Sequence, residues 1–98
     1  KVVNGQANDE VRQAIVTALA QVRAGKLSPL AYHMARRQMD AAMLSAYSGI
    51  SRLRIRWHLR PGPFARLPEA MLRRYAEALQ ISADELRGVP EGDAHARL

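Results

Sequence analysis

The chain has 98 residues, no cysteine, and 15 Lys or Arg against 9 Asp or Glu, for a formal net charge of +6. This length supports one domain with a single modest core, the absence of cysteine excludes disulfides, Cys-containing metal sites and thiol catalysis, and the positive charge favours a polyanion as partner. No apolar run approaches the roughly 20 residues of a membrane span, and the first residues lack the layout of a signal peptide, so we expect a soluble, cytoplasmic protein that does not bind membranes.

Two helices are expected in the first part of the chain. Asn8 is expected to cap a helix that Gly25 ends, and its inward residues recur at helical spacing: Val11, Ala14, Ile15, Ala18, Leu19 and Val22. Ser28 followed by Pro29 is typical of a cap and a first helical position, and predicts a second helix to about Arg37. Its expected inward residues are Leu30, Ala31, Met34 and Ala35.

The middle of the chain predicts two short helices joined by a glycine. Asp40 caps a third helix that ends at Gly49, with Met43 and Leu44 facing the core. Ser51 caps a fourth, arginine-rich helix, which must stop at the break formed by residues 61–63, Pro-Gly-Pro.

The last part predicts two more helices. Pro68 precedes a fifth helix from Glu69 to about Gln80, whose inward residues are Met71, Leu72, Tyr75, Ala76 and Leu79. Ser82 caps a final helix that ends at Gly88 and Pro90. Residues 91–98 are expected to be a frayed tail. Because no segment alternates with a period of two, the fold class is all-α.

The fourth predicted helix lies in a strongly basic zone. Residues 23–66 hold nine basic side chains and one acid, which gives +8, while residues 1–22 are neutral and residues 67–98 carry −2. Stepping about 100° per residue places Ile55, His58 and Leu59 on the buried side and Leu53 and Trp57 directly opposite. The flanks carry the arginines Arg52, Arg54, Arg56 and Arg60.

Two stretches resemble the lambda-repressor-like family, which includes the phage repressors, the Cro proteins and many small bacterial regulators. "DAAMLSAYSGISRLRIRWHLRPG" (residues 40–62) is similar to the helix-turn-helix motif, and "LPEAMLRRYAEALQISADELRG" (residues 67–88) is similar to the closing helices. The chain departs from the family at Ala41, where glutamine often contacts the DNA backbone, and at Ser48 and His58, which are usually apolar. The resemblance implies five lambda-repressor-like helices within residues 28–90, with an extra N-terminal helix in residues 1–27 that packs on the domain or is used in dimerisation.

Resemblance and charge together predict a sequence-specific double-stranded DNA-binding transcriptional regulator, a bacterial or phage repressor that acts as a homodimer. A major groove about 12 Å wide accepts one helix, here residues 51–60. Arg52 is expected to contact a guanine, Leu53 a thymine methyl group, the flanking arginines the phosphates, and the helix N-terminus at Ser51 a phosphate through its amides. The predicted DNA-binding residues are Ser51, Arg52, Leu53, Arg54, Arg56, Trp57 and Arg60.

Several alternatives stay open from the sequence. Leu53 and Trp57 would equally suit a protein partner, as in an interaction module such as the antitoxin of a toxin-antitoxin pair, and Trp57 could instead fold into the core or a dimer contact. Arg36 and Arg37 are expected either to approach phosphate or to be solvated. No catalytic constellation, metal-ligand spacing or phosphate cradle is recognisable, so we expect neither enzymatic activity nor a metal or cofactor.

Overall fold

The described part of the chain is all-α, as expected. The computed structural model describes residues 2–90, and the side chains of residues 9–90, so the expected tail at 91–98 lies outside the described residues. No strand occurs in this part of the chain. Its helices are α1 (Val2–Arg23), α2 (Pro29–Arg36), α3 (Ala41–Ser48), α4 (Arg52–His58), α5 (Pro61–Ala65), α6 (Glu69–Leu79) and α7 (Ala83–Leu86).

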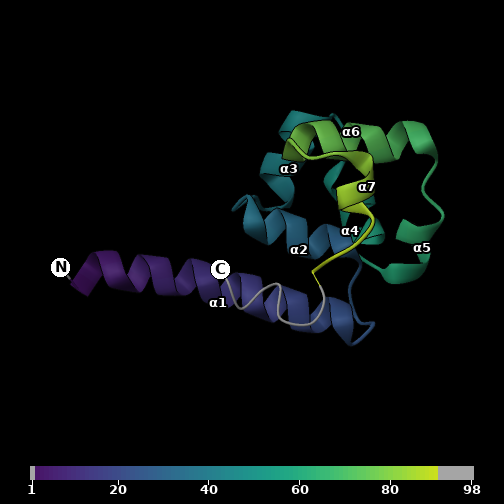
Figure 1. Ribbon diagram of the computed structural model, residues 1–98. Coiled ribbons are helices and arrows are strands. Elements are labelled where there is room, and N and C mark those ends of the chain that lie inside the picture. The colour runs from purple at the N-terminus through teal and green to yellow at the C-terminus, as the bar shows by residue number, and fades with distance from the viewer. Residues whose placement is uncertain (1, 91–98) are drawn as a thin grey trace.

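Helix α1 packs against α2, and its N-terminal part extends beyond the other helices (Figure 1). Leu19, with only 2% of its surface exposed, is its most deeply buried side chain among those described. The helix begins at Val2, so the prediction that Asn8 caps it is wrong. Asparagine inside a helix is less favourable than alanine by only about 0.7 kcal/mol or less, which is too little to stop a helix that has begun earlier. None of the described helices is both long and apolar enough to cross a bilayer.

The remaining helices enclose one hydrophobic core (Figure 1). The buried core residues are Leu30, Met34, Leu44, Ile50, Ile55, Phe64, Leu72, Tyr75, Ala76, Leu79 and Leu86. Helix α6 contributes four of them, more than any other helix, because its apolar residues recur at helical spacing. Of its predicted inward residues, only Met71 stays partly exposed. Ile55 is the residue of α4 that belongs to this core.

Side-chain caps fix the N-terminal boundaries of three helices. Asp40 accepts a hydrogen bond from the Met43 amide, Ser51 accepts one from the Arg54 amide, and Ser82 forms a capping box with Glu85. These three predicted caps are confirmed.

Three local features differ in part from the predictions. Ser28 is the N-cap residue of α2 and Pro29 begins the helix, as predicted, but the Ser28 hydroxyl makes no capping bond because it bonds to α4 instead. Met43 is 42% exposed, because Leu44 and Ser48, four residues apart, take the inward side of α3 and turn Met43 outward. Helix α4 ends before the Pro-Gly-Pro segment, as predicted, but residues 61–63 form the first turn of α5, which was not predicted; proline suits the first helical position.

Candidate nucleic-acid interface

The turn between α3 and α4 depends on Gly49. This residue ends α3 with φ of 75°, in the left-handed region, which glycine adopts without the strain of a Cβ. The next residue, Ile50, is 2% exposed and donates its amide hydrogen to Ser48 Oγ. Arg74 of α6 donates from Nε and Nη2 to the Ser48 carbonyl at 3.2 and 3.0 Å. The turn thus fixes how α4 leaves α3.

The inward side of α4 follows the expected helical wheel. Ile55 is fully buried, His58 is 9% exposed, and Leu59 packs at the edge of the core. A polar residue is tolerated at this buried position because His58 Nδ1 shares a hydrogen bond of 2.8 Å with the hydroxyl of Tyr75 on α6. The two rings also pack edge to face, with centroids 5.7 Å apart. The pair therefore ties α4 to α6.

Burial controls the ionisation of this pair. Removal from water lowers the pKa of His58, and the nearby positive charge of Arg54 lowers it further. Burial likewise raises the pKa of Tyr75 to about 12. Desolvation disfavours the charged form of each group, so the pair is neutral near pH 7 and puts no charge beneath α4.

Ser28 anchors the end of α4. Its buried Oγ donates to the His58 carbonyl at 2.7 Å, and its amide donates to the Leu59 carbonyl, also at 2.7 Å. These are C-terminal carbonyls of α4, which have no partner within the helix. Ser28 therefore joins the start of α2 to the end of α4.

The outward side of α4 is exposed and cationic. Leu53 and Trp57 are 77% and 55% exposed. The seven predicted site residues all lie in α4 or directly beside it, and all are exposed: Ser51, Arg52, Leu53, Arg54, Arg56, Trp57 and Arg60. The guanidinium carbon of Arg60 lies 5.4 Å from the centroid of the Trp57 ring, within the range of a cation–π contact. The hydroxyl of Ser51 accepts the capping hydrogen bond from the Arg54 amide.

Several arginines elsewhere in the chain have intramolecular partners. Arg37 donates to the carbonyls of Leu79 and Gln80 at the end of α6, so its guanidinium group is not merely solvated. The equivalent role at the end of α3 belongs to Arg74. The carbonyl of Pro90 accepts a bond from Arg23, and Glu69 binds Arg73 and Arg87. Within the described residues, Arg36 has only a long bond of 3.4 Å to the Tyr32 hydroxyl.

The arginines of residues 52–66 differ from these. Among the described residues, no carboxylate or carbonyl accepts a bond from the side chains of Arg52, Arg54, Arg56, Arg60 or Arg66. Arg66, which follows α5, was not among the predicted site residues. It follows the proline-rich segment 61–63, where no helix was predicted. The one sequence signal that includes it is the positive charge of residues 23–66.

The described side chains offer no group of three or more His, Cys, Asp or Glu residues that could hold a metal ion. Comparisons with protein-family models, with curated proteins and with solved structures gave no match.

Proposed function

We propose that the chain is a sequence-specific double-stranded DNA-binding regulator with a lambda-repressor-like arrangement, in which α3 and α4 form the helix-turn-helix. The observation that carries the proposal is the set of five arginines in residues 52–66 that have no acidic or carbonyl partner in the described chain, on and beside a helix held by its opposite side. A single helix fits a major groove about 12 Å wide, whose walls are phosphates.

The exposed residues of α4 have distinct roles in this proposal. Arg52, in the first turn, reads a guanine through two hydrogen bonds, and Leu53 contacts a thymine methyl group. Arg54, Arg56 and Arg60 bind phosphates, which position the protein without reading sequence. Because seven residues of helix contact few bases, two copies act as a homodimer on half-sites about one DNA turn apart, and the regulator represses by occupying its operator.

The salt dependence of binding tests the proposal. Three phosphate contacts in each half-site, from Arg54, Arg56 and Arg60, give a log-log slope of about −2.7 per half-site, which is an affinity loss of about 40-fold per half-site between 50 and 200 mM salt. A selection of bound duplexes from a random pool supplies the cognate site, and the emission of Trp57 reports binding. A slope near zero would refute the proposal.

Single substitutions separate base reading from phosphate binding. Arg52→Ala should weaken cognate binding by about 1–3 kcal/mol and relax specificity at one base pair, whereas Arg60→Ala should weaken all sequences alike and make the slope shallower by about 1. Arg12→Ala, which removes an exposed arginine of α1, is the charge-matched control. Equal losses on cognate and random duplexes for Arg52→Ala would remove it from base reading.

A protein-interaction module, such as an antitoxin, is the second candidate. The exposure of Leu53 and Trp57 favours it, because large apolar side chains four residues apart on one helix suit a protein groove. Binding of a protein through these residues would depend weakly on salt, and Leu53→Ala would weaken it more than Arg56→Ala. The opposite order is expected for DNA.

A further inference from the structure

Helix α5 places two arginines at its ends. Arg60 is its N-terminal cap and Arg66 its C-terminal cap, and both are exposed. Six residues at about 1.5 Å of helical rise separate their backbones by about 9 Å. Because arginine side chains are long, two that start this far apart can bind two different phosphates of one DNA strand.

The backbone between these arginines is held in place. Proline occupies positions 61 and 63, and Phe64, 6% exposed, is part of the core. The Phe64 amide donates to the Arg60 carbonyl, and the Arg66 amide donates to the Pro63 carbonyl. Arg60 also lies over Trp57. Because the backbone of α5 is already ordered, a ligand that binds both guanidinium groups pays little backbone entropy.

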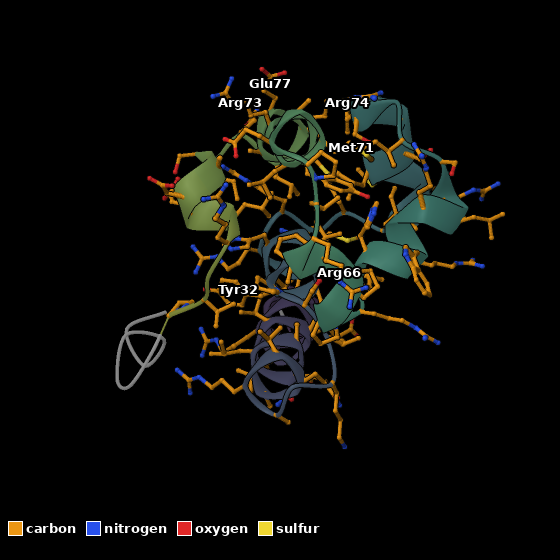
Figure 2. The ribbon with its side chains drawn as sticks, turned by 90° about the vertical axis from the view of Figure 1, so that its right-hand side faces the viewer. Tyr32, Arg66, Met71, Arg73, Arg74 and Glu77 are labelled. Atoms are coloured by element: carbon orange, nitrogen blue, oxygen red, sulfur yellow. The ribbon has the colours of Figure 1, made fainter. Side chains whose placement is uncertain are left out.

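The location of α5 makes it an extension of the α4 surface. The two helices pack together, and Figure 2 shows Arg66 beside α5, well away from Arg73 and Glu77 on α6. No acidic residue occurs between Asp40 and Glu69. The charge of this surface is complementary to a polyanion along its whole length.

We propose that α5 is a phosphate clamp, in which Arg60 and Arg66 grip the backbone of one strand beside the groove that α4 enters. The clamp rests on the proposed function and adds Arg66 and the α5 backbone to it. If α5 binds phosphates, the affinity for DNA depends on α5, whereas the preference for one base sequence does not.

Four variants test the clamp by titration of cognate and random duplexes at several salt concentrations. Arg66→Ala should lower affinity about tenfold per half-site on both duplexes and make the log-log slope shallower by about 0.9 per half-site. Arg66→Lys should keep the slope, because a lysine still neutralises one phosphate. Arg73→Ala removes the same side chain from α6, where it pairs with Glu69 at 3.5 Å. The double variant Arg66→Ala/Glu77→Gln restores the net charge at a distant position.

The outcomes separate the clamp from the proposed function. If Arg66→Ala matches Arg73→Ala, or if Glu77→Gln restores the affinity of Arg66→Ala, the clamp is wrong while DNA binding by α4 stands. If the unmodified chain binds neither duplex, the proposed function fails and the clamp with it. Unchanged thermal unfolding of Arg66→Ala is expected, since its side chain has no hydrogen bond or ion pair within the described part of the chain.

Discussion

Ser28→Ala should destabilise the chain although it removes a single oxygen atom. The serine side chain is fully buried, and its hydroxyl donates to the His58 carbonyl at 2.7 Å across 30 residues of sequence. Alanine fits the same space, since it lacks only the hydroxyl, and the Ser28 amide keeps its bond to Leu59. The substitution therefore isolates one buried hydrogen bond between α2 and α4.

The expected loss is the penalty of leaving that carbonyl unpaired. A buried acceptor without its donor costs about 1–3 kcal/mol, a large part of the 5–15 kcal/mol or so by which a domain of this kind is stable. Each 1 kcal/mol lowers the Tm of a domain of this size by about 4–8 °C. Burial of apolar surface is unchanged, so the urea m-value should stay the same.

Urea unfolding followed by circular dichroism measures this loss. Ser45→Ala is the matched control, because Ser45 lies on α3 and its hydroxyl makes no bond within the described residues. Alanine is also the better helix former, so Ser45→Ala should leave stability unchanged or raise it by a few tenths of a kcal/mol or so. A Ser28→Ala loss below about 0.5 kcal/mol would show that the His58 carbonyl does not depend on this bond.

Two further predictions concern the turn and the pH. Gly49→Ala should cost about 1–2 kcal/mol for the left-handed conformation. The new Cβ would lie 2.8 Å from Arg74 Nη2, at the end of a flexible side chain, so the further cost is that of displacing Nη2 from its hydrogen bond to the Ser48 carbonyl. In an Arg74→Ala background only the conformational part should remain, and an equal loss in both backgrounds would contradict this coupling. Burial lowers the pKa of both His58 and His33 from 6.5. Just below pH 6.5 the folded chain therefore binds fewer protons than the unfolded chain. The free energy of unfolding should be highest above pH 6.5 and fall as the pH drops below it. Urea midpoints at pH 7.5 and 5.5 measure this fall, which His58→Gln should reduce, and a wild-type midpoint independent of pH would refute it.

The sequence predicted those features that depend on neighbouring residues. Asp40, Ser51 and Ser82 cap their helices by bonding to an amide three residues ahead, and Gly49 is a left-handed glycine after an apolar helix. The alternation of inward and outward residues on α4 follows from the helical period. These rules need no knowledge of the rest of the chain.

Features that depend on distant residues could not be predicted in this way. Ser28 precedes a proline as a capping serine would, yet its hydroxyl bonds to a carbonyl 30 residues later. The helical wheel predicted that His58 is buried, but it could not predict its partner, the hydroxyl of Tyr75, 17 residues away. The prolines of residues 61–63 indicate a break, and only the burial of Phe64 shows why a short helix forms there.

The arginines of this chain fall into two classes. Some bind carbonyl groups at helix ends, and those on and beside α4 have no such partner in the described chain, so α4 depends on contacts with other helices for its stability. Arg37 and Arg74 stabilise the ends of α6 and α3 by donating to their carbonyls. Along α4 and just after it, arginines recur four residues apart at positions 52, 56 and 60, a spacing at which like charges destabilise a helix by about 0.2–0.5 kcal/mol per pair.

A seven-residue helix with this repulsion would not form alone in water. It persists because Ile55 is buried in the core, His58 bonds to Tyr75, and Ser28 binds the carbonyls at its end. The fold thus holds together a surface whose charges oppose its own stability. A polyanion that lies along this surface would remove the repulsion between the arginines. Double-stranded DNA, the ligand proposed for α4 and α5, is such a polyanion.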